Sequence, residues 1–219
     1  MKHIRRAMTF TELLMAMVIT LIIGLAVATV SRTLSSAHAQ SERCYGAIQT
    51  ARHAMRRIQL DLQKAQLITA VAVDSRRLLC WTGDENGDKE INLSELVILS
   101  YVTETDEMVE RQVVFPDTMP QATRDALDEP FTLQEATNLL SMAPRIRDDA
   151  YCRTLLLGAN VREGWFSAQP APPLSTLVSV RITVGEGDQS LTLRSAARLR
   201  ADVTEHVGTA GDDWVLSLP

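Results

Sequence analysis

Residues 84–95, Asp-Glu-Asn-Gly-Asp-Lys-Glu-Ile-Asn-Leu-Ser-Glu, place oxygen-bearing side chains at spacings that suit metal coordination. In the twelve-residue calcium loop, ligands stand at positions 1, 3, 5, 7, 9 and 12, and position 7 contributes its backbone carbonyl. Here those positions are occupied by Asp84, Asn86, Asp88, Glu90, Asn92 and Glu95. Because Ca²⁺ takes six to eight oxygen ligands, the spacing predicts a calcium site. Bound calcium would order the loop and would not catalyse a reaction.

Lys89 departs from this pattern at position 6, where the motif has glycine in a left-handed conformation. Any other residue costs on the order of 1 kcal/mol there. We therefore expect weak binding, about 10⁻⁴–10⁻³ M, as in extracellular calcium modules. The alternative is a solvated acidic loop between two strands, because Leu78–Trp81 reads as a strand and not as the entering helix of an EF-hand.

The rest of the sequence shows no spacing or motif that is typical of a catalytic site. The four histidines, His3, His38, His53 and His206, have no partner at metal-ligand or triad spacing. The sequence contains no nucleophile elbow, phosphate-binding loop or dinucleotide fingerprint. Its net charge of −5 and pI of about 5.4 do not favour nucleic acid as a partner. We expect neither an enzyme nor a nucleic-acid-binding protein.

The three cysteines, Cys44, Cys80 and Cys152, lie too far apart for a metal knuckle or a Cys-x-x-Cys redox motif. In an oxidising compartment one pair can form a disulfide. Cys80 and Cys152 both lie in strand-like sequence and are the candidate pair. Three buried free thiols are the alternative.

The N-terminal thirty residues place a short basic head before a long apolar run. Residues 13–30 carry no charge, and eighteen helical residues span about 27 Å, close to a hydrocarbon core of about 30 Å. Basic residues remain on the cytoplasmic side, so we expect residues 8–30 to cross the membrane once and send the rest outward. The basic head consists of Lys2, His3, Arg5 and Arg6.

This start resembles the signal of type IV prepilin-like proteins. In that comparison MKHIRRA, residues 1–7, is a leader, Ala7 precedes the cut, Met8 becomes the first mature residue and Glu12 the fifth. Ala7 and Met8 stand where the family most often has Gly and Phe. The resemblance implies cleavage and N-methylation by a prepilin peptidase. It also implies that Glu12 pairs with the terminal amine of a neighbouring subunit during filament assembly.

Two other interpretations of the N-terminus remain open. A plain signal anchor would have the same basic head and apolar run, with Glu12 as an interfacial charge. A cleaved secretory signal is suggested by Ala37-His38-Ala39, which has the small-x-small form of a signal peptidase site and would leave Gln40 as the first residue. Against the secretory signal, the apolar run exceeds the roughly 7–15 residues of such signals.

Residues 31–70 are predicted to continue the helix, because they contain no proline and one glycine, Gly46. Apolar residues recur at a three-four spacing that makes one stripe. The stripe comprises Ile48, Ala51, Met55, Ile58, Leu62 and Ala65, and the opposite side carries Arg52, Arg56, Gln59, Gln63 and Lys64. The segment RHAMRRIQLDLQKAQ, residues 52–66, resembles the corresponding helix of J-type minor pseudopilins of type II secretion.

Residues 71–205 are rich in Val, Ile, Leu and aromatic residues separated by turn residues, which predicts antiparallel strands. A final hairpin is expected around Gly185–Asp188. Residues 117–149 differ and predict a helical insertion: one short helix over Asp117–Asp128 and a second over Thr132–Met142, opened by a Thr132-x-x-Glu135 capping box. Pro130 and Pro144 bracket the second helix. Residues 206–219 are predicted to form a polar tail that either extends into solvent or packs against the head through Trp214.

Together these segments predict an α+β fold with a long N-terminal helix, first transmembrane and then amphipathic, packed on an antiparallel head, as in pilins. The resemblance implies a J-type minor pseudopilin of a type II secretion pseudopilus, held in the inner membrane by one pass with its head in the periplasm. Its partners would be other pseudopilins, prepilin peptidase and membrane lipid. The alternatives are a minor type IV pilus subunit and a signal-anchored periplasmic calcium-binding module that does not polymerise.

Overall fold

A computed structural model describes residues 9–84, 86–186, 189–199, 203–211 and 213–218. The chain divides into two compact units, Met1–Gly46 and Ala47–Pro219. Its elements are a long apolar N-terminal helix, shorter helices and antiparallel sheets, so the predicted α+β class is confirmed. The predicted leader, residues 1–7, and Met8 lie outside the described residues.

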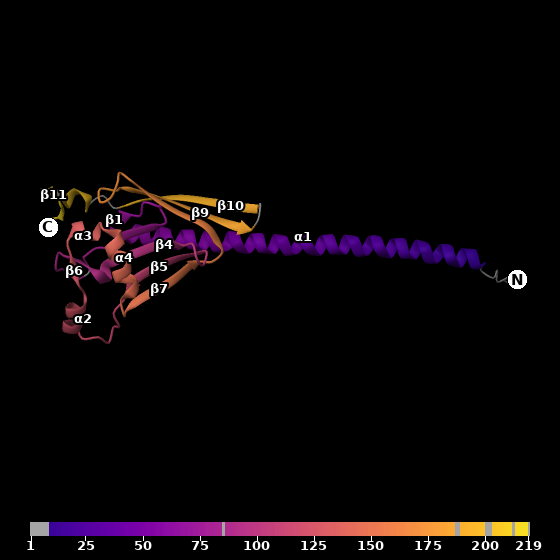
Figure 1. The fold of residues 1–219 in the computed structure, drawn as a ribbon, viewed down its shortest axis with the longest axis horizontal. Coiled ribbons are helices and arrows are strands. Elements are labelled where there is room, and N and C mark those ends of the chain that lie inside the picture. Colours follow the sequence, from indigo (N-terminus) through magenta and orange to yellow (C-terminus); the bar gives the residue numbers. More distant parts are fainter. Residues whose placement is uncertain (1–8, 85, 187–188, 200–202, 212, 219) are drawn as a thin grey trace, which may run out of the picture. The chain divides into compact units, whose positions relative to one another are not determined.

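Helix α1, Phe10–Lys64, runs without a break from the first unit into the second (Figure 1). All described residues of the first unit are exposed, including the apolar run that ends at Val30. Within the described residues, α1 is the one helix long and apolar enough to span a membrane. The predicted spanning segment therefore lies in a continuous helix.

In the second unit the predicted apolar stripe of α1 faces a core. Five of its members are buried, and Ile48 is half-buried. The helix ends at Lys64, although the predicted helix continues to residue 70. Leu67–Val71 instead form strand β1, whose consecutive residues Leu67 and Ile68 are both fully buried in different cores. A strand places successive side chains on opposite faces, so Leu67 and Ile68 can reach different cores. The single apolar stripe of a helix faces one core only.

The larger sheet contains five antiparallel strands in the order β1-β2-β4-β5-β7. After β1 its members are β2, Arg77–Trp81; β4, Leu96–Val102; β5, Glu107–Val113; and β7, Cys152–Gly158. The smaller sheet has the order β10-β9-β8, with β8, Val161–Gln169; β9, Leu177–Glu186; and β10, Gln189–Arg198. Glu186 pairs with Gln189, so the predicted final hairpin is confirmed, although Gly187 and Asp188 of its predicted turn lie outside the described residues.

Both faces of the five-stranded sheet are buried over β1, β2 and β4. Leu78 and Cys80 of β2 join the core that contains α1 and the smaller sheet, whereas Leu79 and Trp81 join a second core on the other face. This explains the apolar runs Leu78–Trp81 in β2 and Leu96–Leu99 in β4, since a strand covered on one face only alternates apolar with polar residues.

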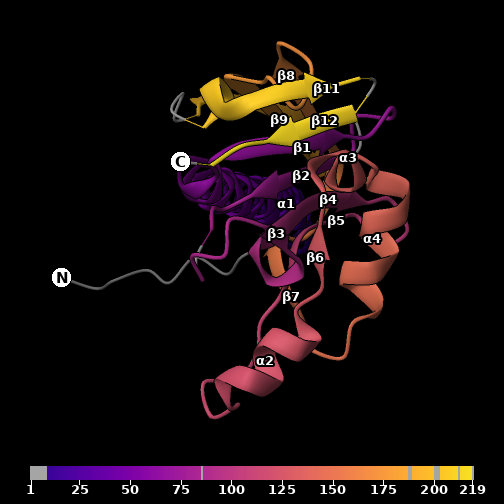
Figure 2. The same cartoon turned by 90° about the vertical axis from the view of Figure 1, so that its left-hand side faces the viewer.

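The second core is covered by the helical insertion and the C-terminal residues. Figure 2 shows α3 and α4 beside this sheet, with the hairpin of β11 and β12 above α3. The short elements are β3, Ile91–Asn92; η1, Leu93–Glu95; α2, Gln121–Leu127; β6, Pro130–Phe131; α3, Leu133–Ala136; α4, Leu139–Asp148; η2, Thr204–His206; β11, Val207–Ala210; and β12, Asp213–Leu216.

The predicted insertion is present with changed boundaries. The Thr132–Glu135 capping box forms as predicted, with the Glu135 amide donating to Thr132 Oγ1 over 3.2 Å. The helix that it opens is short, because Asn138 leaves the helical conformation (φ −87°, ψ 84°) and α4 begins after it. Pro144 lies inside α4, so the prediction that it ends the second helix is wrong.

The predicted tail is ordered over its described part as the β11–β12 hairpin. The Trp214 amide donates to Gln134 Oε1 over 3.1 Å, and the Trp214 side chain packs against the second core. The chain from residue 203 therefore belongs to the same unit as the sheets, and of the two predicted behaviours it adopts the packed one.

Candidate functional site

The predicted calcium loop, residues 84–95, follows β2 and includes β3 and η1. Glu85 lies outside the described residues, and the other loop residues are joined by hydrogen bonds from their own side chains. The Asp84 carboxylate accepts three backbone amides, from Gly87 at 2.6 Å, Asp88 at 3.1 Å and Lys89 at 2.9 Å. Lys89, at position 6 of the motif, has φ +67°, the conformation that the motif reserves for glycine. The loop therefore turns where a calcium loop turns, with a lysine in the strained position.

Asp88 is the second centre of hydrogen bonding in the loop. It accepts the Glu90 amide at 2.8 Å and the side-chain amides of Asn92 at 2.8 Å and Asn86 at 2.7 Å. Burial disfavours the charged form of Asp88, but these hydrogen bonds outweigh it and lower the pKa of the carboxyl. Asp88 is therefore a carboxylate at neutral pH.

Glu95, at position 12, is only 2 % exposed. Its Oε2 accepts the indole N–H of Trp81 at 2.8 Å and the Asn92 amide at 3.2 Å. The Trp81 side chain lies in the second core, so the carboxylate at the end of the loop is anchored to the packed interior. Asn92 and Glu95 also form a capping box at the start of η1.

The loop residues fit calcium by their chemistry, since carboxylate and amide oxygens are the ligands that it prefers. Asp84, Asn86, Asp88, Glu90, Asn92 and Glu95 would hold it. As placed in the described part of the chain, no three His, Cys, Asp or Glu side chains gather closely enough to bind a metal ion. The carboxylates of Asp84 and Asp88 instead accept hydrogen bonds from the loop itself, and Glu95 also accepts one from the Trp81 indole. Bound calcium would compete with these hydrogen bonds.

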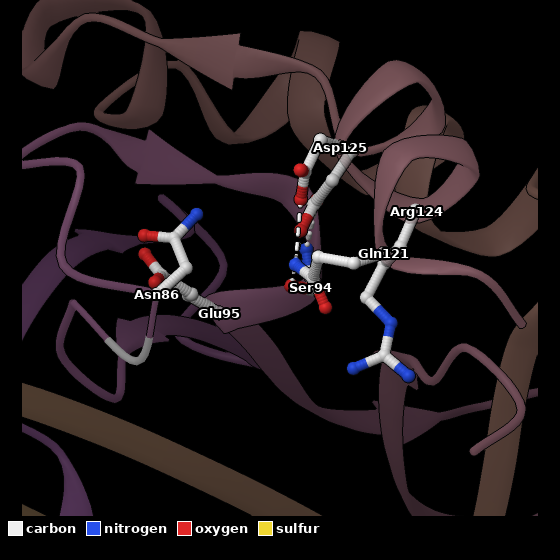
Figure 3. Close-up of a pocket in the computed structure, with 7 residues that line it drawn as sticks. Asn86, Ser94, Glu95, Gln121, Arg124 and Asp125 are labelled. Atoms are coloured by element: carbon white, nitrogen blue, oxygen red, sulfur yellow. Dashed lines mark hydrogen bonds between the residues drawn. The ribbon is translucent and has the colours of Figure 1, made fainter.

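A polar hollow of about 300 Å³ lies beside the loop, and the sequence did not predict it. Figure 3 shows Asn86 and Glu95 on one side of it and residues of α2 on the other. Three of the lining side chains are carboxylates and one is a guanidinium. The lining residues are Asn86, Ser94, Glu95, Gln121, Arg124, Asp125 and Asp128.

Asp128 joins the two sides of this hollow. It accepts the Ser94 amide at 2.9 Å and the Ser94 hydroxyl at 2.5 Å, and so ties the start of η1 to the end of α2. Gln121 donates to Asp125 over 2.7 Å within α2. The sequence signal was weak, because Ser94 and Asp128 are 34 residues apart and each is an ordinary polar residue beside a short helix.

At the N-terminus the structure describes Glu12 but not the predicted processing residues Ala7 and Met8. The Glu12 carboxylate accepts the Thr9 amide at 2.9 Å and the Thr9 hydroxyl at 3.1 Å. Thr9 Oγ1 in turn faces the Glu12 amide at 3.4 Å. This reciprocal arrangement is the capping box of a helix N-terminus.

The predicted disulfide between Cys80 and Cys152 is wrong. Cys80 lies in β2 and Cys152 in β7, with β4 and β5 between them, and all three cysteines are free. The alternative of three buried thiols is right about the free state but wrong about burial, because Cys44 is exposed and Cys152 is half-buried. Three strand spacings of about 4.8 Å separate the two backbones by about 14 Å, whereas a disulfide requires Cα atoms within about 7 Å. The sequence showed that both residues lie in strands but not the order of the strands in the sheet.

The described residues thus define an α+β protein with one helix able to span a membrane and a β-rich unit that carries a hydrogen-bonded acidic loop and a polar hollow. A scan of the chain against models of known protein families finds no match. A search of curated proteins finds no similar sequence.

Proposed function

We propose that the chain is an assembly subunit of a pilus-like filament, and specifically a J-type minor pseudopilin of a type II secretion pseudopilus. The observation that carries this proposal is the division of α1. One uninterrupted helix exposes an apolar stretch in Met1–Gly46 and buries its stripe in the core of Ala47–Pro219. Exposed apolar surface of this extent requires lipid or other helices to cover it.

The proposed subunit is inserted in the inner membrane by this helix, with Ala47–Pro219 in the periplasm. Prepilin peptidase cuts after Ala7 and methylates Met8. In the filament the helix leaves lipid for a bundle of neighbouring helices. A buried carboxylate such as Glu12 is stabilised there by a partner of opposite charge, and the terminal amine of a neighbour supplies it.

The experiment that tests this proposal is the mature N-terminus of the membrane-extracted protein, by intact mass and N-terminal peptide sequencing. We expect a start at Met8, heavier by one methyl group. A mature N-terminus at Gln40 would indicate a secreted soluble protein and would contradict the filament proposal. An uncut Met1 would favour the anchored module. A minor type IV pilus subunit would have the same N-terminus, and co-purification with secretion or pilus components distinguishes the two.

The second candidate function is a membrane-anchored calcium-binding module. It is favoured by the left-handed conformation of Lys89 and by the three amides that Asp84 gathers, since the backbone already turns as a calcium loop does. When bound, calcium would order the loop. Calcium binding and filament assembly are independent properties. If the chain is cut before Met8 and also binds calcium, it is a filament subunit with a calcium site. If Met1 is uncut and calcium binds, the chain is an anchored calcium-binding module.

A further inference from the structure

A part-buried cluster of charges joins α1 to β5 in the second unit, with the Arg57 side chain 37 % exposed at its edge. Arg57 lies on α1, Asp61 follows one helical turn later, and Glu110 lies on β5. Arg57 Nε is 3.3 Å from Glu110 Oε2 and 3.2 Å from Asp61 Oδ2, and Arg57 Nη2 donates to Glu110 Oε1 over 3.5 Å. A single guanidinium therefore serves two carboxyl groups from different elements.

Both carboxyl groups are almost completely withdrawn from water. The Asp61 side chain is 8 % exposed and that of Glu110 is 11 % exposed. Asp61 Oδ2 is fully buried and accepts no hydrogen bond within the described part of the chain, although it forms the ion pair with Arg57. Burying two negative charges against one positive charge leaves an uncompensated charge, which is strongly unfavourable in a core. A proton on one carboxyl group removes it.

The other titratable groups near the cluster do not supply the missing charge. Lys64, one turn further along α1, is exposed and acts on Asp61 only through a weak Coulombic attraction. Cys80 of β2 faces the same core, and burial raises the pKa of its thiol to about 12, so it is neutral. Burial first, and then the charge and hydrogen bond of Glu110, raise the pKa of Asp61 to about 7 against the attraction of Arg57 and Lys64.

We propose that Arg57, Asp61 and Glu110 form a proton-dependent clamp between α1 and β5. With a proton on Asp61, Arg57 neutralises Glu110 and the Asp61 carboxyl group donates to the remaining carboxylate. When the proton leaves, two carboxylates compete for one guanidinium and the contact between helix and sheet weakens. The clamp makes docking of α1 on the sheet tighter in mildly acidic surroundings than in alkaline ones.

The direction of the pH dependence follows from the proton balance. An unfolded chain releases the Asp61 proton near its ordinary pKa of 3.8, whereas the folded chain holds it until about pH 7. Between these values the folded state binds one more proton, so raising the pH favours unfolding. One proton corresponds to about a tenfold rise in the unfolding equilibrium constant per pH unit. The rise should end above about pH 7.5.

The test is urea unfolding of the full-length chain in detergent micelles, followed by tryptophan fluorescence between pH 4.5 and 8.5. All three tryptophans, Trp81, Trp165 and Trp214, lie in Ala47–Pro219, so the signal reports that unit. The matched variants are Asp61→Asn, which imitates the protonated group and can still donate to Glu110, and Glu163→Gln, which removes an exposed carboxylate paired with Arg181 at 2.9 Å.

We expect Asp61→Asn to flatten the pH dependence by about tenfold per unit and Glu163→Gln to leave it unchanged. Glu110→Gln should also flatten it, because Asp61 then has Arg57 to itself, and this variant serves if Asp61→Asn does not fold. Infrared difference spectra at pH 6 should show a protonated carboxyl band in the wild type that Asp61→Asn lacks. An undiminished slope in both clamp variants, or an unchanged carboxyl band in Asp61→Asn, would overturn the proposal.

Discussion

The Glu12 carboxylate caps its own helix, accepting the backbone amide of Thr9 at 2.9 Å and its hydroxyl at 3.1 Å. The same carboxylate is the group that the proposed function assigns to the amine of a neighbouring subunit. A capping box uses an acceptor oxygen and tolerates glutamine at this position, whereas an ion pair requires the charge. The two roles can therefore be separated by substitution.

If the filament role holds, Glu12→Gln should abolish assembly as thoroughly as Glu12→Ala, because the charge is lost in both. Thr9→Ala should assemble, because it removes the capping hydroxyl and keeps the carboxylate. The measurement is the amount of sheared filament that contains the variant chain, with tryptophan fluorescence of detergent-extracted protein as a control for folding. If Glu12→Gln assembled normally and Thr9→Ala did not assemble, Glu12 would act only as a helix cap and the proposed ion pair would be wrong.

For the calcium loop, we expect millimolar Ca²⁺ to raise the melting temperature of the wild-type chain in detergent and Mg²⁺ to raise it less. Asp84→Ala and Glu95→Ala should remove the calcium-dependent increment, and Asp117→Ala, an exposed acidic residue outside the loop, should retain it. The melting temperature of each variant with calcium is compared with that of the same variant in chelator. This control is needed because loss of Glu95 also leaves the buried Trp81 indole N–H without this acceptor. A wild-type chain without any increment would identify an acidic loop that binds no calcium.

Lys89→Gly tests the turn of the same loop. Glycine adopts the left-handed conformation of residue 89 without the steric cost that lysine bears, on the order of 1 kcal/mol. Because residue 89 already has φ +67° in the folded chain, this cost belongs to folding and not to calcium binding. The variant should therefore raise the free energy of unfolding by up to about 1 kcal/mol and leave the calcium affinity close to that of the wild type. The measurements are urea unfolding in chelator and calcium titration, both followed by tryptophan fluorescence. A less stable variant would show that residue 89 is not strained in this turn.

Gly164 should not tolerate even a methyl group. A Cβ atom there would lie 2.5 Å from Met108 Sδ and 2.7 Å from Tyr101 Cβ, where β8 crosses the larger sheet. Overpacking of this kind costs typically 1–3 kcal/mol. Gly208→Ala is the matched control, since its Cβ position has no atom within 4 Å among the described residues other than its two neighbours in the chain. We expect urea unfolding to show a loss of that size for Gly164→Ala and a change within about 0.5 kcal/mol for Gly208→Ala.

The cysteines should behave as three independent thiols. Cys44 is exposed and should react quickly with a maleimide, whereas Cys80 is fully buried with a raised pKa and should react only after unfolding. Mass spectrometry under non-reducing conditions should find no Cys80–Cys152 peptide. A labelled Cys80 in the folded protein would contradict the burial of its thiol, and the linked peptide would contradict the strand order of the larger sheet.

The features that the sequence alone predicted correctly are local ones. The apolar run before Val30, the stripe from Ala51 to Ala65 and the Thr132–Glu135 capping box all follow from spacings of one or two helical turns, and the structure contains each of them. The apolar run Leu96–Leu99 of β4 also indicated a strand, because strand-forming side chains and their turns lie within a few residues of one another.

The tertiary structure decided which of these pieces meet. Leu67–Val71 became a strand because β2 was available to pair with it, and Cys80 and Cys152 were parted by the two strands that lie between theirs. Arg57 and Glu110 are 53 residues apart, and Ser94 and Asp128 are 34 apart. No short-range spacing encodes such contacts. They depend on strand order and on the packing of both faces of the sheet, which the whole chain settles together.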